Sequence, residues 1–422
     1  MEINELIQGV SRCECGKDHA CPIDSVVIGD GAISSLSAIA SGYSSVLLVA
    51  DQNTYSVCGD AVARELSGKL CDTLIYQRDG ILVPNEEAIG ELDARVTGKV
   101  ELIVGIGSGV INDLCKIVSF NHSLPYFIVA TAPSMDGYAS RGSALILGGM
   151  KVTLNADVPR AIIADTSVLA DSPFEMIQAG FGDIIGKYSC LNDWRLSSLV
   201  NGEYICQRVL DMTYEVVDRT VLLANGIKSR NKDAVGALME ALVAVGILMA
   251  YVGNSRPASG SEHHLSHYFE IVGIERGEEY LPHGIDVCFS AIETARLRER
   301  LLEIKDISSF EYSFDMDDYK AEIRRIYGSV SDGVIELQSK LGWYSIDRVS
   351  IYKEKWSEIK AILADCPSSA QMLSMCHSVG LDFNTFTELY GKGKIDDALL
   401  YAKDLKDRYT VLWMYFDLLK NK

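Results

Sequence analysis

Leu102–Asp113 reads LIVGIGSGVIND, and this stretch decides the predicted fold. Leu102–Ile106 is a short β-rich apolar run, and the glycines after it lead into a segment with helical spacing. Comparable apolar runs, each followed by a Gly, Asp, Asn or Pro break, lie at Val26–Ile28, Val46–Ala50, Leu74–Tyr76 and Phe127–Ala130. Because helical segments alternate with these runs, we predict an α/β region with a parallel, Rossmann-like sheet and helices on both faces.

The character of the chain changes near residue 170. Ser172-Pro173 is typical of a helix start, and almost only helical patterns follow it. We therefore predict an α/β dinucleotide-binding domain over residues 1–170 and an all-helical metal- and substrate-binding domain over residues 171–422, with the active site in the cleft between them. Residues 144–147 and 151–154, joined by Gly148-Gly149-Met150, predict a hairpin attached to the sheet. Residues 305–422 are interpreted as support or an oligomer surface.

Composition and charge exclude several classes of protein. The chain has 422 residues, 48% of them apolar, and a formal charge of −19. That charge argues against binding to nucleic acid or to an anionic membrane surface. We find no run that predicts a membrane span and no secretory signal at the start, so we expect a cytoplasmic protein. In that compartment the eleven cysteines are expected to be reduced thiols rather than a disulfide framework.

The N-terminal segment holds Cys13, Cys15, His19 and Cys21 close together in sequence. This pattern resembles a zinc knuckle, but no second ligand pair follows at a finger-like distance. Cys-x-Cys is also a tight spacing for one tetrahedral ion. The sequence leaves the role of this cluster open.

Histidines are concentrated between residues 263 and 283. His263 and His267 are four apart, so on a helix both imidazoles lie on one face, and His283 follows shortly after. Two imidazoles and one carboxylate suit zinc, nickel or iron and leave a position for substrate. Asp183 lies in an apolar, glycine-flanked run where an unpaired carboxylate is costly, so it is the natural third ligand. The alternative is a polar helix face with chance histidines.

Two segments after predicted strands favour a nucleotide. The glycine turn before Val110 would let a helix N-terminus approach a pyrophosphate, although it departs from the G-x-G-x-x-G pattern and could serve tight packing alone. Asp51 ends an earlier strand, where it could bind a ribose diol or form an Asx turn. Residues 130–141, which include Asp136, are polar and would lie at the carboxyl edge of the sheet, where phosphate, nicotinamide or substrate could bind.

Taken in order, these motifs resemble a known family. The glycine turn is followed by Thr131–Gly137 (TAPSMDG), Gly182–Lys187 (GDIIGK), Arg256–His263 (RPASGSEH) and His283-Gly284. This order resembles the glycerol-1-phosphate dehydrogenases of the iron-containing alcohol dehydrogenase and dehydroquinate synthase superfamily. The resemblance covers roughly residues 24 to 300 and extends more weakly to the C-terminus, as in the longer bacterial members. Arg256–His263 is its most specific element.

The resemblance implies a role for each matching residue. Asp183, His263 and His283 would bind the metal, and His264 has no counterpart. Asp136, Asp183 and His267 would contact substrate, with Asp183 and His267 catalytic. The dinucleotide-binding positions would be Gly109, Val110, Ile111, Asn112, Asp113, Thr131, Ala132, Pro133, Ser134 and Ser140.

The activity that the resemblance implies is reversible hydride transfer. NAD(H) or NADP(H) would reduce dihydroxyacetone phosphate to sn-glycerol 1-phosphate with the help of one divalent ion, zinc first and nickel or iron as alternatives. The partner is then a small phosphorylated triose or polyol, and we expect a homo-oligomer, a dimer or larger. Alternatives are a polyol or glycerol dehydrogenase, a dehydroquinate synthase-like cyclase, whose relatives have Glu where this chain has Asp183, and a non-catalytic binding protein.

Overall fold

A computed structural model describes residues 2–148 and 150–420 of the chain. It contains two compact units. The first consists of Met1–Ile184 with Glu215–Asn254, and the second of Ile185–Tyr214 with Ser255–Lys422. The first unit is built on a parallel sheet and the second is helical, so the predicted fold class is confirmed.

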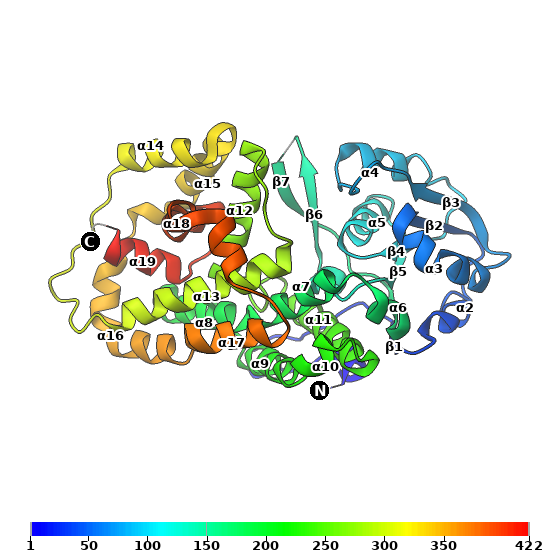
Figure 1. Ribbon diagram of the computed structural model, residues 1–422, viewed down its shortest axis with the longest axis horizontal. Helices are drawn as coiled ribbons and strands as arrows, with labels where there is room; N and C mark the ends of the chain where they lie inside the picture. The colour runs from blue at the N-terminus through cyan, green and yellow to red at the C-terminus, as the bar shows by residue number, and fades with distance from the viewer. Residues whose placement is uncertain (1, 149, 421–422) are drawn as a thin grey trace. The chain divides into compact units, whose positions relative to one another are not determined.

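The first unit contains a six-stranded sheet in the order β1-β8-β5-β4-β2-β3, with every neighbouring pair parallel. Its strands are drawn from dark blue to teal in Figure 1. Central strands β4 and β5 are buried along their whole length, which explains their unbroken apolar runs. The strands are β1 (Ser25–Gly29), β2 (Val46–Asp51), β3 (Leu70–Tyr76), β4 (Leu102–Gly107), β5 (Tyr126–Ala130) and β8 (Ala161–Asp165).

Helices cover the sheet of the first unit. Helix α3 (Gln52–Glu65) packs on β2, β3 and β4, and α5 (Gly109–Asn121) packs on β2, β4 and β5. Leu48, Val104 and Phe127 are in register on three adjacent strands and lie in one apolar core. Each such side chain contributes roughly 1.5–3 kcal/mol through burial. The other α-helices of this unit are α1 (Ile3–Ile7), α2 (Leu36–Ile39), α4 (Glu86–Asp93), α6 (Thr166–Asp171), α7 (Phe174–Ile185, whose last residue belongs to the second unit), the part of α9 (Gln207–Leu222) from Glu215 on, α10 (Ala224–Lys228) and α11 (Lys232–Val252).

The predicted hairpin is present as β6 (Gly142–Leu147) and β7 (Met150–Asn155), which pair antiparallel. The hairpin is confirmed, and it forms a two-stranded sheet of its own rather than pairing with a strand of the six-stranded sheet. The hairpin is fastened to α5 instead, because Ser143 Oγ donates to the carbonyl of Asp113 over 2.8 Å. Gly149 of the expected turn lies outside the described residues.

Helix α11 is the only helix in residues 2–148 and 150–420 that is long and apolar enough to cross a membrane. Its most apolar stretch is 78% buried inside the protein. The helix packs against α6, β1 and β8. Its composition therefore matches the position of a core helix of the first unit.

The change from strands to helices occurs at β8 and α6, close to residue 170. The compact units divide the chain elsewhere. Residues 185–214 belong to the second unit, and the chain then returns to the first unit over Glu215–Asn254. This segment contains α11, whose apolar side chains are buried against strands of the sheet. One contiguous boundary in the sequence therefore does not describe the two units.

The second unit is made of helices. Its centre is α13 (His283–Leu302), which packs against α12 (Ser261–Arg276), α16 (Arg348–Ala364), α17 (Ser369–Ser378) and α19 (Val411–Leu419). Fully buried Arg298 on α13 pairs with Asp193 at 2.7 Å, which satisfies both charges inside the unit. The remaining helices are α8 (Lys187–Asn201), the first part of α9 (Gln207–Leu222), α14 (Met316–Tyr327), α15 (Ser331–Leu341) and α18 (Asn384–Tyr401).

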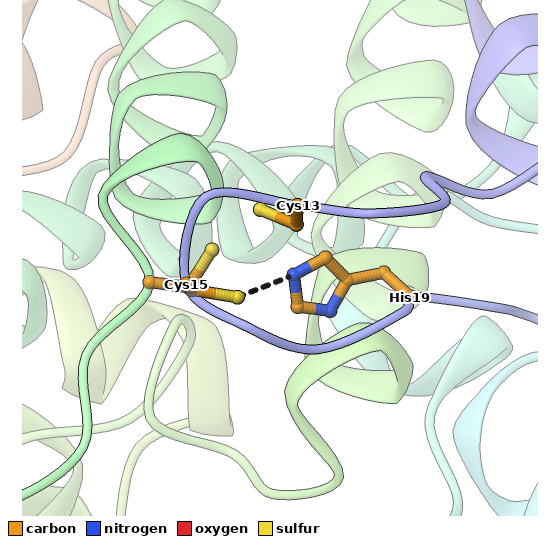
Figure 2. A group of neighbouring side chains, drawn as sticks. Cys13, Cys15 and His19 are labelled. Carbon is orange, nitrogen blue, oxygen red and sulfur yellow. Dashed lines mark hydrogen bonds between the residues drawn. The ribbon is translucent and has the colours of Figure 1, made fainter.

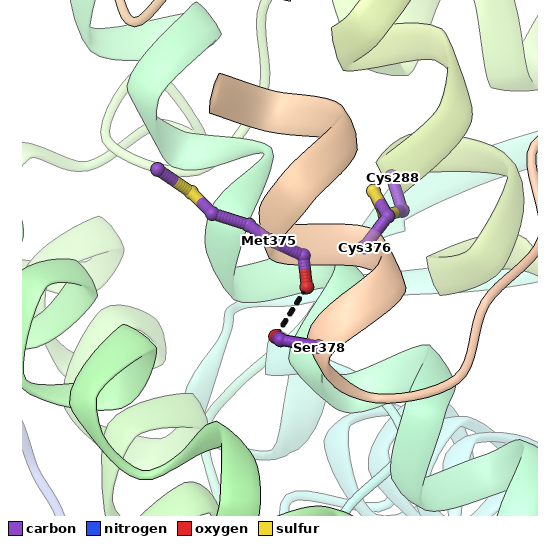
Figure 3. Close-up of a disulfide and its surroundings, with 4 residues drawn as sticks. All are labelled: Cys288, Met375, Cys376 and Ser378. Carbon is purple, nitrogen blue, oxygen red and sulfur yellow. Dashed lines mark hydrogen bonds between the residues drawn. A yellow bond between two sulfur atoms is a disulfide. The ribbon is translucent and has the colours of Figure 1, made fainter. Parts of the chain in front are cut away.

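A disulfide joins Cys288 on α13 to Cys376 on α17, as Figure 3 shows. Their Cα atoms lie 6.9 Å apart and both side chains are fully buried. The expectation that all cysteines are reduced is therefore wrong for this pair. That expectation rests on the cysteine content and on the first residues of the chain. Neither reveals that α13 packs on α17 and brings Cys288 next to Cys376.

Candidate functional site

The predicted nucleotide-binding segments of the first unit follow three adjacent strands. β2 ends at Asp51, β4 at Gly107 and β5 at Ala130, and these strands lie in the order β5-β4-β2. From β2 the chain continues outward to β3, whereas from β4 it continues in the opposite direction to β5. The carboxyl ends of β2 and β4 therefore flank a topological switch point, which is where parallel α/β sheets bind ligands.

The turn between β4 and α5 has the form expected for an anion-binding helix start. Helix α5 begins at Gly109 directly after the strand, so its first backbone N–H groups lie at the carboxyl edge. A Cβ at Gly107 would lie 2.6 Å from Cβ of Ile111, so this glycine is required for the close packing of the turn. A Cβ at Gly109 would have no neighbour nearer than 3.6 Å, which leaves room on that side of the turn.

Asp113 and Ser140 belong to a network around Lys116. The ammonium group of Lys116 is fully buried and donates to the carbonyls of Gly137 and Gly142 over 3.0 and 2.8 Å. It also lies 3.4 Å from a carboxylate oxygen of Asp113, whose other oxygen accepts from the backbone N–H of Ala144 over 3.2 Å. Burial lowers the pKa of Lys116, and the Asp113 carboxylate acts against that shift. Lys116 thus fixes α5 to the polar loop, a role that sequence analysis missed.

Asp51 caps helix α3. Its Oδ1 accepts from the backbone N–H groups of Asn53 and Thr54 over 2.8 and 2.9 Å, and Thr54 completes a capping box. The Asx turn that the sequence offered as one role of Asp51 is therefore present. Contact of Asp51 with a ribose stays a prediction.

Two helices hold the polar loop after β5 from Thr131 to Ser140. A Cβ at Gly180 of α7 would lie 1.8 Å from the carbonyl oxygen of Pro133, and one at Gly246 of α11 would lie 2.9 Å from that of Asp136. Both helices can approach the loop only because these positions are glycine. Within the loop, Tyr138 donates to the carbonyl of Ala132 over 2.7 Å. The loop is therefore a rigid part of the first unit.

Asp183 lies near the end of α7 and is fully buried. Its Oδ2 accepts a hydrogen bond from the backbone N–H of Asp136 over 3.0 Å. The structure thus brings together two residues expected to contact substrate, one from the polar loop and one from the first helical segment. The hydrogen bond orients the Asp183 carboxylate.

The second unit brings the three predicted histidines together. His263 and His267 lie one turn apart on α12, and His283 is the first residue of α13. The ring centroid of His283 lies 5.2 Å from that of His263 and 5.5 Å from that of His267. The alternative of unrelated histidines on a polar helix face therefore does not describe this cluster.

Hydrogen bonds orient two of these rings. Nδ1 of His263 lies 2.7 Å from Oε1 of fully buried Glu262, and Nδ1 of His283 lies 3.3 Å from Oγ of Ser266. A carboxylate only accepts, so Nδ1 of His263 carries the hydrogen and Nε2 has a lone pair available for a metal. Burial raises the pKa of Glu262, but the hydrogen bonds that its carboxylate accepts from His263 and from the backbone N–H of Gly260 act against burial, and this pKa lies below its ordinary value.

The N-terminus of α12 is held by α8. Oδ2 of Asp193 accepts from the backbone N–H of Ser261 over 2.7 Å, while Asp193 pairs with Arg298. A Cβ at Gly260 would lie 2.6 Å from Cα of Cys190, so only glycine permits this approach. His263 and His267 of α12 therefore rest on a rigid, buried support.

One cation of the C-terminal segment contacts the histidine cluster, and a second contacts the chain just before α12. Nζ of Lys406 lies 3.4 Å from Nε2 of His267. Arg408 donates to the carbonyl of Ser259 over 2.6 Å, and burial followed by the charge of Arg256 lowers the pKa of Arg408 to about 10. The interpretation of residues 305–422 as support or oligomer surface alone is therefore incomplete. No signal in the sequence links Lys406 to His267, because they lie 139 residues apart.

Three further basic side chains of the second unit are engaged or buried elsewhere. Buried Arg256 forms an ion pair with half-buried Glu203, and Lys187 is fully buried at the start of α8. His264 is also fully buried, and within the described residues neither of its ring nitrogens forms a hydrogen bond. Burial and the charge of Lys406 hold the pKa of His264 well below its ordinary value, so this ring stays neutral.

Comparison with known proteins identifies the family. Residues 27–173 match the family of iron-containing alcohol dehydrogenases. The chain is 30% identical to a glycerol-1-phosphate dehydrogenase [NAD(P)+] of Halalkalibacterium halodurans, over 97% of this chain and 96% of that protein. It is 31% identical to the Bacillus licheniformis protein of the same name, over 78% of this chain and 83% of that protein. The chain belongs to the glycerol-1-phosphate dehydrogenase family. As a member of that family it is an oxidoreductase that acts on a small molecule.

A solved structure supports the fold. The chain resembles sulfoacetaldehyde reductase of Bifidobacterium kashiwanohense, determined in complex with NAD+, with a TM-score of 0.61. The match covers 96% of this chain and 99% of that one, at 14% sequence identity. At this identity the likeness establishes the fold of this family member and not its substrate.

Proposed function

We propose that this chain reduces the carbonyl group of dihydroxyacetone phosphate with NAD(P)H, reversibly, to give sn-glycerol 1-phosphate. The observation that carries the proposal is a cluster of three imidazoles with a lysine ammonium beside it, His263, His267, His283 and Lys406. Imidazoles suit a divalent cation, and the ammonium suits an anionic substrate. The activity carried in the names of the curated relatives agrees with both features.

The proposed metal ligands are Asp183, His263 and His283, a set of buried or half-buried donors that could hold one ion. The donor set fits a divalent transition metal, because the hydrogen bond to Glu262 leaves Nε2 of His263 as a lone-pair donor. When bound, such an ion would polarise the substrate carbonyl and favour negative charge on its oxygen. Zinc is our first choice, and the same ligands also suit nickel or iron.

The proposed dinucleotide site uses the carboxyl edge of the sheet. The pyrophosphate would lie against the start of α5, at Gly109–Asp113, where backbone N–H groups and the helix dipole favour an anion. Thr131–Ser134 and Ser140 would contribute further contacts, and Asp51 would face the ribose. Lys116 keeps the loop that carries Ser140 fixed relative to α5 through the carbonyls of Gly137 and Gly142. NADH and NADPH both fit this description.

His267 and Lys406 would handle the proton and the substrate charge. An ammonium group only donates, so Nε2 of His267 accepts from Lys406 and the ring hydrogen lies on Nδ1. In this proposal His267 would pass a proton to the substrate oxygen, and Lys406 would bind the phosphate. Asp136 would accept a hydrogen bond from a substrate hydroxyl, while its backbone N–H orients Asp183.

The competing functions differ in charge and in redox balance. A glycerol or other polyol dehydrogenase would have no use for a lysine beside the histidines, so Lys406 favours a phosphorylated substrate. A dehydroquinate synthase-like cyclase would regenerate its nicotinamide within each turnover. We test this by following NADH absorbance while dihydroxyacetone phosphate is added. Stoichiometric loss of NADH supports the proposal, whereas turnover without net loss would identify a cyclase.

A further inference from the structure

We infer that the N-terminal segment carries a second metal site, separate from the proposed catalytic ion, in which Cys13, Cys15, His19 and Cys206 bind one zinc ion. These four residues form a group whose donor atoms could hold a metal ion. Sulfur and imidazole ligands in the combination Cys3His are typical of closed, structural zinc sites. Cys21, which the sequence places near the other N-terminal ligands, is not part of the group.

Three of the ligands lie on one loop of the first unit. The two sulfur atoms of Cys13 and Cys15 and an imidazole nitrogen of His19 are within 4.8 Å of one another. Figure 2 shows the three side chains converging, with Sγ of Cys15 3.3 Å from Nε2 of His19. Zn–S and Zn–N bonds of ordinary length at a tetrahedral angle place S and N about 3.6 Å apart. The observed separation is close to that value.

The tautomer of His19 supports a ligand role. Its Nδ1 lies 2.9 Å from the backbone carbonyl oxygen of Tyr251, in a fully buried position. A carbonyl only accepts, so Nδ1 carries the hydrogen and the lone pair of Nε2 faces the cysteine sulfurs. This is the arrangement in which metal-binding histidines are normally held, with the second nitrogen fixed by a carbonyl or carboxylate. The ring of Tyr251 also stacks on that of His19 at a centroid distance of 5.4 Å.

The loop is shaped to bring Cys13 and Cys15 to one ion. Gly16 adopts φ +83°, and its N–H donates to the carbonyl of Cys13 over 2.9 Å, so the chain turns sharply after Cys15. Val10 and His19 exchange two backbone hydrogen bonds of 2.8 Å and close the base of the loop. This turn removes the objection that Cys-x-Cys is too tight a spacing. In the proposed site, His19 and Cys206 are the two ligands in addition to Cys13 and Cys15.

Cys206 is fully buried and directly precedes α9, far from the loop in sequence. We assign the site a structural function, because its donors are three thiolates and one imidazole. Three thiolates and one neutral imidazole leave no position for substrate, so this ion would take no part in hydride transfer.

The test uses the full chain with His283→Ala, a change in the proposed catalytic set that leaves the cysteines intact. The protein is produced with zinc in the medium and dialysed against a chelator. Elemental analysis should then find one zinc per chain, and X-ray absorption at the zinc edge should show mainly sulfur neighbours at about 2.3 Å. A metal-free protein, or a zinc with only nitrogen and oxygen neighbours, would overturn the assignment.

Matched cysteine variants identify the ligands. In the His283→Ala background, Cys15→Ser and Cys206→Ser should each reduce the retained zinc to a small fraction of the chains. Cys71→Ser, at an exposed thiol, and Cys21→Ser, beside the loop, should leave it unchanged. Retention of zinc in both Cys15→Ser and Cys206→Ser would contradict the four-ligand site. Cobalt substitution of the parent protein should give a thiolate charge-transfer band, which shows cysteine coordination without a cysteine change.

Discussion

His263 donates a hydrogen bond from Nδ1 to the carboxylate of Glu262, and these two atoms lie 2.7 Å apart. Glu262 is fully buried and also accepts from the backbone N–H of Gly260 over 2.8 Å. One carboxylate therefore fixes both the start of α12 and the orientation of the first histidine on that helix. Glu262 is a positioning residue, because it acts on the metal through His263.

Replacement of Glu262 by Gln should weaken metal binding while the fold is kept. The amide oxygen can still accept the two hydrogen bonds, but the negative charge that makes His263 a better donor is lost. We expect metal affinity to fall roughly 10- to 100-fold, measured by competition with a chromogenic chelator. Glu279→Gln, on an exposed loop residue, is the control. Equal affinities of the two variants would contradict the positioning role.

Replacement of His283 by Ala should abolish turnover and remove the proposed catalytic ion, because two ligands cannot hold it firmly. Binding of NADH, followed by fluorescence, should remain within a few-fold of the parent. The control is His377→Ala, at an exposed position in the last turn of α17. A fully active His283→Ala enzyme would reject the assigned metal ligands.

Replacement of Lys406 by Ala should act on the phosphorylated substrate. Loss of one charge-assisted hydrogen bond of about 1.5–3 kcal/mol lowers kcat/KM for dihydroxyacetone phosphate roughly 10- to 150-fold. The value for dihydroxyacetone should change much less, since that substrate has no phosphate. Lys392→Ala, at an exposed side chain of α18, serves as the control. An equal loss for both substrates would show that Lys406 does not bind phosphate.

Replacement of Asp113 by Ala should weaken NADH binding far more than substrate binding. The change leaves the backbone N–H of Ala144 without its acceptor and the buried Lys116 without a carboxylate, so the turn at the start of α5 loses its support. We expect a rise in the Kd of NADH of roughly tenfold, from a loss on the order of 1–3 kcal/mol. Asp113→Asn keeps an acceptor and should show a smaller effect. If the change weakens substrate binding more than NADH binding, the turn at the start of α5 does not bind the cofactor.

The features predicted from sequence are those that depend on local pattern. The apolar run at Leu102–Ile106 and its glycine turn form β4 and the start of α5, because period and turn chemistry act over a few residues. The spacing of His263 and His267 places both on one face of α12 in the same way.

The features that sequence did not reveal depend on contacts between distant segments. Lys406 approaches His267 and Cys288 approaches Cys376 only through the packing of helices within the second unit. Glu262 is different, because it directly precedes His263 and its position next to a proposed ligand was a usable signal. The sequence predicts two domains that meet at one boundary, whereas the first compact unit also includes Glu215–Asn254 from far along the chain.

The most direct test of the account is an NADH oxidation assay on metal-stripped enzyme. The chain is stripped with a chelator, and zinc, nickel or iron is restored separately, with dihydroxyacetone phosphate and dihydroxyacetone compared as substrates. We predict no turnover in the stripped enzyme and recovery with at least one of these ions, with a clear preference for the phosphorylated substrate. Full activity of the stripped enzyme, or equal rates with both substrates, would contradict the proposed site.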